Sequence, residues 1–248
     1  MRQSAIELFS ELFYPPRCMV CGEVLSRKEK RFGLCIRCRA SVTVIKEPFC
    51  MKCGKKLLDS SLEYCEDCEE SGKNRFFSSG RGIYLYDGVM REVMYRFKYK
   101  NKRYYADYFA RQALRLYHRW ISDIKPDLIL PVPMFKAKMK KRGYDQAMCF
   151  ASSLSKVFNI PVGKGILSRV RGTLPQKGLS GAQRRLNLKN AFHIRGNLVQ
   201  SQRILLVDDI YTTGSTVDAA AEALKIKGAA EVCCMYICVG SGKRRRKK

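Results

Sequence analysis

Eight cysteines in the first third of the chain constrain its fold more than any other feature. They form four pairs, and two residues separate the cysteines of each pair. The pairs are Cys18 and Cys21, Cys35 and Cys38, Cys50 and Cys53, and Cys65 and Cys68. With this spacing both thiolates of a pair bind one ion, and two pairs complete the tetrahedral coordination of a structural Zn²⁺. The sequence therefore predicts two closed zinc sites, which contribute to folding and not to catalysis.

The spacing does not determine which two cysteine pairs share a zinc ion. We expect consecutive pairs to share a zinc ion; the alternative is a crossed arrangement in which the first pair joins the third. Gly22 and Gly54 each follow the second cysteine of a pair, where glycine permits the positive φ of a knuckle turn. Disulfides are the weaker interpretation, because Glu7 and Glu11 interrupt the apolar N-terminal stretch and argue against a secretory signal.

Hydropathy and charge bound the class of protein. No apolar run reaches the roughly 18 residues of a membrane helix, so we expect a soluble cytoplasmic protein without membrane insertion. The formal net charge is +26. Residues 1–75 are nearly balanced, with 14 basic and 11 acidic residues, whereas the remainder has 34 basic and 11 acidic residues. This excess predicts a polyanionic partner, which is a phosphate compound, a nucleic acid or both.

Strand and helix patterns alternate after the cysteines, which predicts an α/β domain with a mainly parallel sheet. The expected strands are 127–133, 166–169, 192–194, 204–207 and 232–239. Helices are expected within 87–122, with a break near 100–102, and over 146–158 and 215–227. We therefore divide the chain into a zinc module, 1–74, and a larger domain, 75–248, with 71–79 as the linker between them. Parallel sheets bind ligands at the carboxyl ends of their strands.

The end of the strand 204–207 carries the chemistry expected of such a site. Asp208 and Asp209 follow the strand, and five small residues lead from there into a helix. These five residues are Thr212, Thr213, Gly214, Ser215 and Thr216. Backbone amides at a helix start bind a phosphate, and the two carboxylates suit the vicinal hydroxyls of a ribose with Mg²⁺ nearby. The pattern predicts a ribose 5-phosphate site, and Ser215 and Asp218 have the spacing of a capping box.

Residues 204–216 resemble the signature of type I phosphoribosyltransferases, which binds 5-phosphoribosyl-1-pyrophosphate (PRPP). Residues 131–147 and 169–192 resemble two further blocks of the ComF family, the competence-associated phosphoribosyltransferase-like proteins, whose layout also places a double zinc ribbon in front. Asp145 is a departure, because the family pattern usually has Asn there. The resemblance implies a type I phosphoribosyltransferase fold with a helical hood, and PRPP with Mg²⁺ as ligand. It also implies a role with single-stranded DNA and competence-machinery proteins during natural transformation.

Two basic segments complete the expected PRPP site. The segment 136–142 follows a strand as a basic loop, and we expect Arg142 and Gly143 to contact PRPP there. The polar segment 171–190 is expected to be a lid, and in the family resemblance it is the flexible loop that closes over PRPP. Arg184 or Arg185 would then balance the charge of the departing pyrophosphate, alongside the carboxylates of the acidic pair as catalytic groups.

The acceptor of a transfer reaction is not evident from the sequence. The hood, about 87–122, interleaves cations with aromatic residues, a pattern that is typical of surfaces for single-stranded nucleic acid but also of an aromatic core. The candidates for DNA contact are Tyr95, Lys98, Tyr99, Lys102, Arg103 and Tyr104. The basic tail 241–248 is a further polyanion contact or a solubilising end. The hypotheses are a transferase of unknown acceptor, a DNA-binding accessory that has PRPP as ligand, and a phosphoribosyltransferase of nucleotide metabolism.

Overall fold

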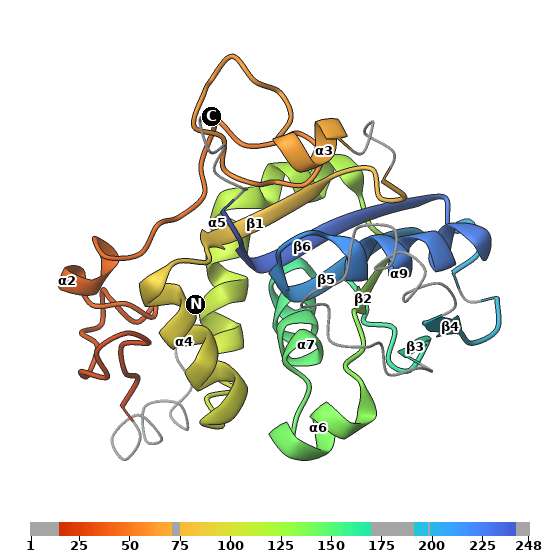
Figure 1. Ribbon diagram of the computed structural model, residues 1–248. Coiled ribbons are helices and arrows are strands. Elements are labelled where there is room, and N and C mark those ends of the chain that lie inside the picture. The colour runs from red at the N-terminus through yellow and green to blue at the C-terminus, as the bar shows by residue number, and fades with distance from the viewer. Residues whose placement is uncertain (1–14, 71–74, 170–190, 198, 242–248) are drawn as a thin grey trace.

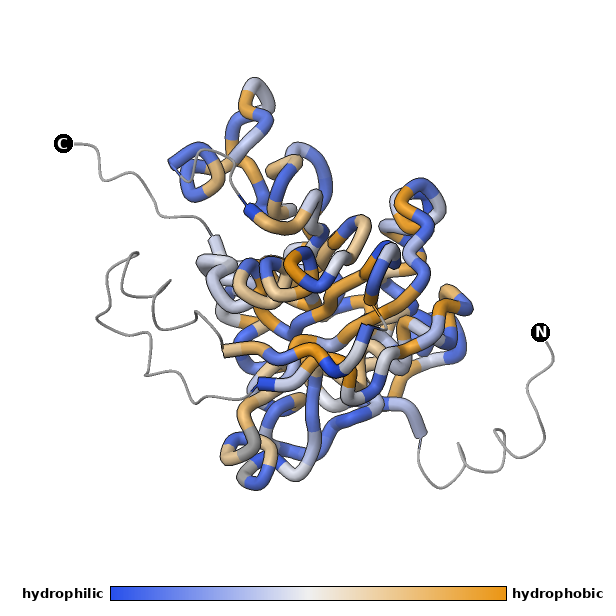
Figure 2. The backbone as a smooth tube through the Cα atoms, turned by 90° about the vertical axis from the view of Figure 1, so that its right-hand side faces the viewer, coloured by the Kyte–Doolittle hydropathy of each residue, from blue (hydrophilic) through white to orange (hydrophobic). Residues whose placement is uncertain are grey.

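The computed structural model describes residues 15–70, 75–169, 191–197 and 199–241 (Figure 1). Its centre is a four-stranded sheet with strand order β1-β6-β5-β2, and all neighbouring strands are parallel. The strands are β1 (Gly80–Leu85), β2 (Leu128–Pro131), β5 (Arg203–Tyr211) and β6 (Glu231–Val239). The central strands β5 and β6 are largely apolar, as strands that are covered on both faces require. Figure 2 shows these hydrophobic segments in the interior of the molecule.

Helices cover both faces of the sheet. On one face α4 (Gly88–Tyr99), α5 (Tyr105–Ile124) and α7 (Gln146–Phe158) share a hydrophobic cluster with Leu205 and Val207. On the other face α9 (Ser215–Ile226) and the antiparallel pair β3 (Leu167–Arg169) and β4 (Phe192–Ile194) share a second cluster with Ile204 and Leu206. Alternate residues of β5 thus face opposite layers, as the geometry of a strand dictates. Among the described helices, none combines the length and the apolar character that crossing a bilayer requires.

The zinc module straddles the β1 edge of this sheet. Its first half, with α2 (Ile36–Arg39), packs in the cluster of α4 and α5, and its second half, with α3 (Glu66–Glu70), packs in the cluster of α9. Between the halves, Val44 forms an antiparallel bridge with Tyr84, and the amide of Ile45 donates to the carbonyl of Ile83 at 2.9 Å. This connection covers the backbone groups that β1 would otherwise present at an open edge.

Most of the expected elements are confirmed, and the hood is broken between residues 99 and 105 as predicted. The strand β1 was missed, because Gly80 and Gly82 are poor strand formers. Gly82 is nevertheless required, since a Cβ there would overlap the side chain of Val239. The linker prediction is wrong from residue 75 onward: Phe77 is fully buried, and the amide of Ser78 donates to the carbonyl of Val232.

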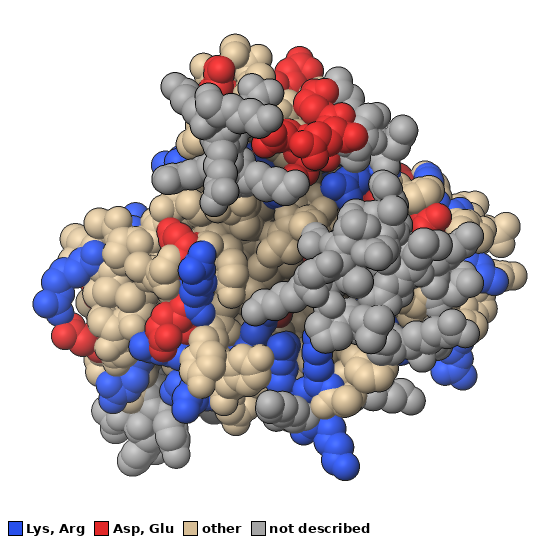
Figure 3. Space-filling model, in the orientation of Figure 1, with Lys and Arg blue, Asp and Glu red and all other residues tan. Residues whose placement is uncertain are grey.

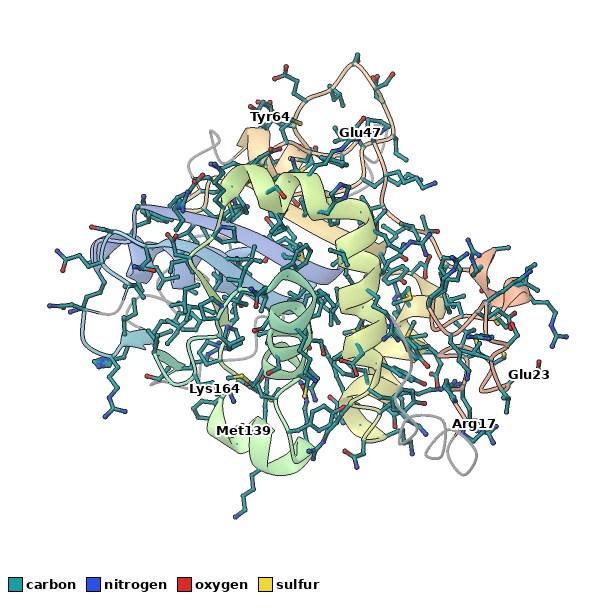
Figure 4. All side chains as sticks on the ribbon, turned by 180° about the vertical axis from the view of Figure 1, so that it is seen from behind. Arg17, Glu23, Glu47, Tyr64, Met139 and Lys164 are labelled. Atoms are coloured by element: carbon teal, nitrogen blue, oxygen red, sulfur yellow. The ribbon has the colours of Figure 1, made fainter. Side chains whose placement is uncertain are left out.

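Two further expectations about loops are corrected. The basic segment after β2 is a short helix, α6 (Lys136–Arg142), which ends at Gly143 with φ +76°. It projects from the body of the molecule beyond α7 (Figure 1), and Met139 marks it in Figure 4. The strand predicted over 204–207 continues to Tyr211, so that Asp208 lies within the sheet, opposite Tyr236 of β6. The acidic pair therefore has a rigid backbone, which a loop would not provide.

Candidate phosphate site and metal centres

The eight paired cysteines form two clusters of four, and the consecutive pairing is confirmed. Within each cluster the ligand atoms lie within 4.8 Å of one another. The clusters are Cys18, Cys21, Cys35 and Cys38, and Cys50, Cys53, Cys65 and Cys68. The crossed alternative is wrong, because the first and third pairs lie in different clusters, on opposite faces of the sheet.

The geometry of both clusters fits zinc. The Sγ atoms of Cys21 and Cys35 are 3.7 Å apart, and those of Cys53 and Cys65 are 3.5 Å apart. A tetrahedral ion with Zn–S bonds of about 2.3 Å requires sulfur separations of about 3.8 Å. Gly22 and Gly54 have φ values of +81° and +74°, which confirms the predicted knuckle turns. Such closed four-thiolate sites hold structural zinc.

A pocket opens at the carboxyl ends of β2 and β5 and brings together charged residues from four elements and from the N-cap of α7. It is lined by Lys98, Val132, Pro133, Met134, Phe135, Lys138, Arg142, Asp145, Ala147, Arg169, Asp208, Asp209, Ile210 and Thr216. Lys98 comes from α4, Arg142 from α6 and Arg169 from β3, and the acidic pair comes from β5. The pocket therefore has the acidic floor and the basic walls that a metal-bound polyphosphate requires.

The two aspartates of the pocket have different surroundings. Burial raises the pKa of the Asp208 carboxyl to about 8, and the nearby charge of Asp209 adds to this shift. Asp209 donates its amide to Oδ1 of Asp208 at 2.8 Å, and its own carboxylate lies 2.8 Å from the ammonium of Lys98. Near neutral pH, Asp208 is therefore able to donate as well as accept a hydrogen bond, whereas Asp209 is neutralised by an ion pair.

Asp145, where the family pattern usually has Asn, caps a helix. Its carboxylate accepts from the amide of Met148, at the start of α7, at 3.1 Å, and from the amide of Met134 at 3.3 Å. It thereby fixes the chain between β2 and α6 against α7. Burial raises the pKa of Asp145. An Asn side chain offers the same acceptor oxygen, so the departure preserves the cap.

The small residues 212–216 form a loop that enters α9. Gly214, with φ +78°, precedes the first residue of α9, and a Cβ at this position would overlap the ring of Tyr211. Asp208 and residues 210–217 line a small recess around this loop. The predicted capping box is wrong, because Gly214 and not Ser215 is the N-cap of α9, without a side-chain cap; the carboxylate of Asp218 accepts from the amide of Phe76 at 2.9 Å. The hydroxyls of Thr213 and Ser215 lie 3.1 Å apart.

The expected nucleic-acid residues divide into two groups. Tyr95, Tyr99 and Tyr104 have exposed fractions of 48%, 47% and 40%, and the rings of Tyr95 and Tyr99 lie 5.2 Å apart. The ammonium of Lys102 lies 5.9 Å from the ring of Tyr104. Lys98 instead turns into the pocket with Asp209. Other aromatic residues of the hood are core, among them Phe97, Tyr105, Phe109 and Tyr117.

Arginines connect this exposed surface to the pocket wall. The guanidinium of Arg142 lies 5.1 Å from the ring of Tyr99 and donates to its hydroxyl at 3.3 Å. Arg103 lies over the ring of Tyr144 at 4.8 Å and donates to the carbonyl of Gly143 at 3.5 Å. In Figure 3, Lys and Arg side chains gather around the lower edge of the molecule near α6, and acidic side chains gather over α3. The charge asymmetry predicted from the sequence is therefore also a spatial asymmetry.

Some site predictions fall outside the described residues, and other site residues were missed. Arg184, Arg185 and the whole segment 170–190 lie outside the described residues, as do residues 242–248 of the tail. Sequence reasoning missed Arg169, which ends β3 beside the pocket. It also assigned Lys98 to the exposed surface. The charge of Lys98 within the helical pattern of α4 was visible, but the pattern does not show which strand the helix faces.

Comparison with known proteins identifies two domains in the chain. Residues 9–69 match the double zinc ribbon domain, and residues 145–248 match the phosphoribosyl transferase domain. The fold and the two metal clusters define a protein of the type I phosphoribosyltransferase fold that carries an N-terminal double zinc ribbon.

Full-length relatives specify the family. The chain is 32% identical over 231 residues to Competence protein F of Haemophilus influenzae, which covers 89% of this chain and 95% of the relative. It is 26% identical to Competence protein ComFC of Bacillus subtilis, with coverage of 79% and 80%. It is 28% identical to the DNA utilization protein YhgH of Escherichia coli K12, with coverage of 92% and 98%. The chain belongs to the ComF family of competence proteins.

Solved structures with a similar fold are more distant. The glutamine PRPP amidotransferase of Bacillus subtilis is 18% identical with a TM-score of 0.37, over 57% of this chain and 30% of the other. A purine phosphoribosyltransferase of Pyrococcus horikoshii is 19% identical with a TM-score of 0.33, over 57% and 95%. The fold assignment rests on the domain matches and on the parallel sheet described above.

Proposed function

We propose that this protein binds PRPP together with Mg²⁺ at the carboxyl end of β5. The observation that carries the proposal is the position of Asp208 and Asp209 directly beside the loop 212–216. In this arrangement the 5-phosphate lies at the start of α9, where backbone amides and the helix dipole favour an anion. The ribose hydroxyls lie at the two carboxyl groups, and the pyrophosphate faces Arg142 and Lys138.

The donor set suits Mg²⁺. Carboxylate and phosphate oxygens are the ligands that Mg²⁺ prefers, and the pocket offers the carboxyl groups of Asp208 and Asp209 within one strand. When bound with PRPP, Mg²⁺ neutralises pyrophosphate charge. The chain's own residues orient the sugar: Asp209 stays fixed by Lys98, and Asp208 exchanges hydrogen bonds with a ribose hydroxyl.

We propose that the basic residues lining the pocket contribute to catalysis by balancing the charge of the leaving pyrophosphate. Arg142 of α6 and Arg169 of β3 both line this space. A guanidinium binds phosphate oxygens in a fork, and its charge is worth most where the pocket excludes water. Arg184 and Arg185 remain our candidates for the same role from the segment 170–190.

We further propose that the protein handles single-stranded DNA in the cytoplasm, with Tyr95, Tyr99 and Tyr104 as stacking surfaces. The support is their exposure beside Lys102 and Arg103, together with the relatives named for competence and DNA utilization. Every base offers a face to an aromatic ring, so such a surface binds without sequence preference. An accessory protein that binds DNA and has PRPP as ligand is the second candidate function, since the chemistry of the described residues does not identify an acceptor.

PRPP binding is tested first, by titration calorimetry in Mg²⁺. We expect wild type to bind and the double variant Asp208→Asn, Asp209→Asn to lose binding while its circular dichroism stays unchanged. Equal affinity of the two proteins would contradict the assignment of the acidic pair. Release of pyrophosphate from PRPP, measured with and without single-stranded DNA, then distinguishes the two functions. DNA-dependent release supports a transferase, and binding without release supports the accessory.

A further inference from the structure

We call residues 212–216 the phosphate loop, after the ligand proposed for them. The chain that follows the second zinc ribbon forms hydrogen bonds with this loop and with the first turn of α9. Arg75 donates through Nη2 to the carbonyl of Thr213 at 3.1 Å, and its Nη1 lies 3.7 Å from the carboxylate of Asp218. The amide of the next residue, Phe76, donates to the same carboxylate at 2.9 Å. Two adjacent residues thus bond to both ends of the segment that turns into α9.

This anchoring segment packs against the second ribbon through Phe77, which shares a hydrophobic cluster with the cysteines of that ribbon. Phe77 is fully buried and meets the ring of Tyr211 edge-on, at a centroid distance of 6.5 Å. Lys55, which is only 3% exposed, pairs with Asp67 of α3, and its ammonium lies 5.9 Å from the ring of Tyr211. Tyr211 is also the residue that closes against Gly214. The amide of Cys50 donates to the carbonyl of Lys55 at 2.7 Å, so Lys55 and Tyr211 connect the second cysteine cluster to the phosphate loop.

The first ribbon has a corresponding arginine that anchors it elsewhere. Arg96 of α4 donates through Nη1 to the carbonyl of Val20 at 2.7 Å. The cysteines of this ribbon share their hydrophobic cluster with α4 and α5, on the face of the sheet opposite α9. Each ribbon thus has a four-cysteine cluster and an arginine bond nearby, but the two ribbons have different neighbours, so variants of one serve as controls for variants of the other.

A loop that is already ordered in the free protein binds its ligand more tightly, because its backbone loses less conformational entropy on binding. Five consecutive small residues have little side-chain packing of their own, so their order depends on outside contacts. The side chain of Arg75 is 11% exposed and bonds to a loop carbonyl. Arg75 contacts a backbone carbonyl of the loop and not the amides that we propose bind the phosphate. It therefore affects binding through the conformation of the loop.

We propose that Arg75 is a positioning residue for the phosphate loop, and that the second zinc site, but not the first, fixes this loop in its binding conformation. The proposal rests on the proposed function for its ligand. It goes beyond it by giving the two zinc sites different roles: the second supports the binding site, and the first supports the hood.

The first experiment compares Arg75→Met with Arg75→Lys and with the matched control Arg96→Met. Binding of ribose 5-phosphate and of pyrophosphate is measured by calorimetry, and exchange of the amides of 212–216 by mass spectrometry. We expect Arg75→Met to weaken ribose 5-phosphate binding about tenfold, as the loss of one charge-assisted hydrogen bond implies. The same amides should exchange faster, while pyrophosphate affinity stays unchanged. Arg75→Lys should restore part of both effects, and Arg96→Met should show neither.

The second experiment uses one buried cysteine of each ribbon, with zinc content measured for each variant. We expect Cys68→Ser to speed amide exchange in 212–216 and to lose ribose 5-phosphate binding, and Cys18→Ser to leave the exchange of 212–216 unchanged. Equal effects of the two variants would overturn the separate roles. If Cys68→Ser does not fold, the arginine variants decide alone: wild-type exchange rates in Arg75→Met would overturn the coupling. A wild type that binds neither PRPP nor ribose 5-phosphate would refute the proposed function, and the exchange rates would still test the coupling.

Discussion

The ammonium of Lys98 lies 2.8 Å from a carboxylate oxygen of Asp209, and the two side chains are 16% and 15% exposed. The lysine comes from the last turn of α4 and the aspartate from the end of β5, so a hood helix reaches the floor of the pocket. The pair brings a positive charge to a site that holds three aspartates. It also shows that the hood takes part in the site and does not merely cover it.

Loss of this lysine should destabilise the fold. In Lys98→Met the carboxylate of Asp209 is left without its partner, which costs about 1–3 kcal/mol of unfolding free energy. The double variant Lys98→Met, Asp209→Asn should recover part of this loss, because it buries no lone charge. Urea denaturation of the four proteins measures the coupling. Additive losses would mean that the ion pair contributes nothing, and Lys100→Met, on the exposed end of α4, is the control.

The stability of the protein should depend on pH through Asp208. Its carboxyl has a pKa of about 8 in the folded protein and of 3.8 without the fold. The folded state therefore binds more protons between these values, and stability falls as pH rises from about 4 to about 8. Asp208→Asn removes this loss, so its Tm should exceed that of wild type by at least about 3 °C at pH 9.

The comparison is made at pH 5 and at pH 9, where the difference between the two proteins should be small and large, respectively. Asp123→Asn, on the exposed face of α5, is the control and should follow wild type at both values. A difference between Asp208→Asn and wild type that is equal at pH 5 and pH 9 would refute the role of the carboxyl's titration.

Zinc content should be two ions per chain, with four thiolates for each ion. Because Cys21 of the first cluster is exposed and all four cysteines of the second are buried, a chelator should remove the first ion faster. Loss of metal, followed with a chromogenic chelator, should therefore have two phases. A single phase, or one ion per chain under reducing conditions, would contradict the assignment.

Single-stranded DNA binding should depend on the exposed tyrosines. Stacking on a ring is worth about 1–3 kcal/mol per base, so Tyr95→Ala or Tyr99→Ala should weaken binding at least about fivefold. Tyr64→Ala is the control, because Tyr64 lies on the second ribbon at the far end of the molecule from α6 (Figure 4). Fluorescence anisotropy at several salt concentrations measures both affinity and its dependence on salt.

Salt separates stacking from charge in the same experiment. The log–log slope should be about −0.7 for each phosphate contacted. Deletion of residues 241–248 should flatten this slope and leave PRPP binding unchanged, whereas the tyrosine variants should keep the slope and lose affinity. Wild-type affinity in both tyrosine variants would mean that only charge binds the DNA.

The sequence by itself determined the features whose parts lie within a few residues of one another. A pair of cysteines two residues apart brings two thiolates within reach of one ion, because one turn of backbone sets the geometry, and four such pairs indicate two zinc sites. The acidic pair and the loop 212–216 are contiguous, so a strand followed by a helix brings them together. The alternation of strands and helices was likewise evident, since each element shows its own hydrophobic period.

Tertiary structure alone decided the features that join distant segments. The strand β1 forms because β6 and the chain around Val44 pair with it. Its sequence does not predict a strand, because Gly80 and Gly82 are poor strand formers. The order of strands then decides that Lys98 meets Asp209 and that Arg75 meets Thr213. Such contacts depend on how the helices pack on the sheet. The local sequence pattern of a helix or a turn does not determine which element it will contact.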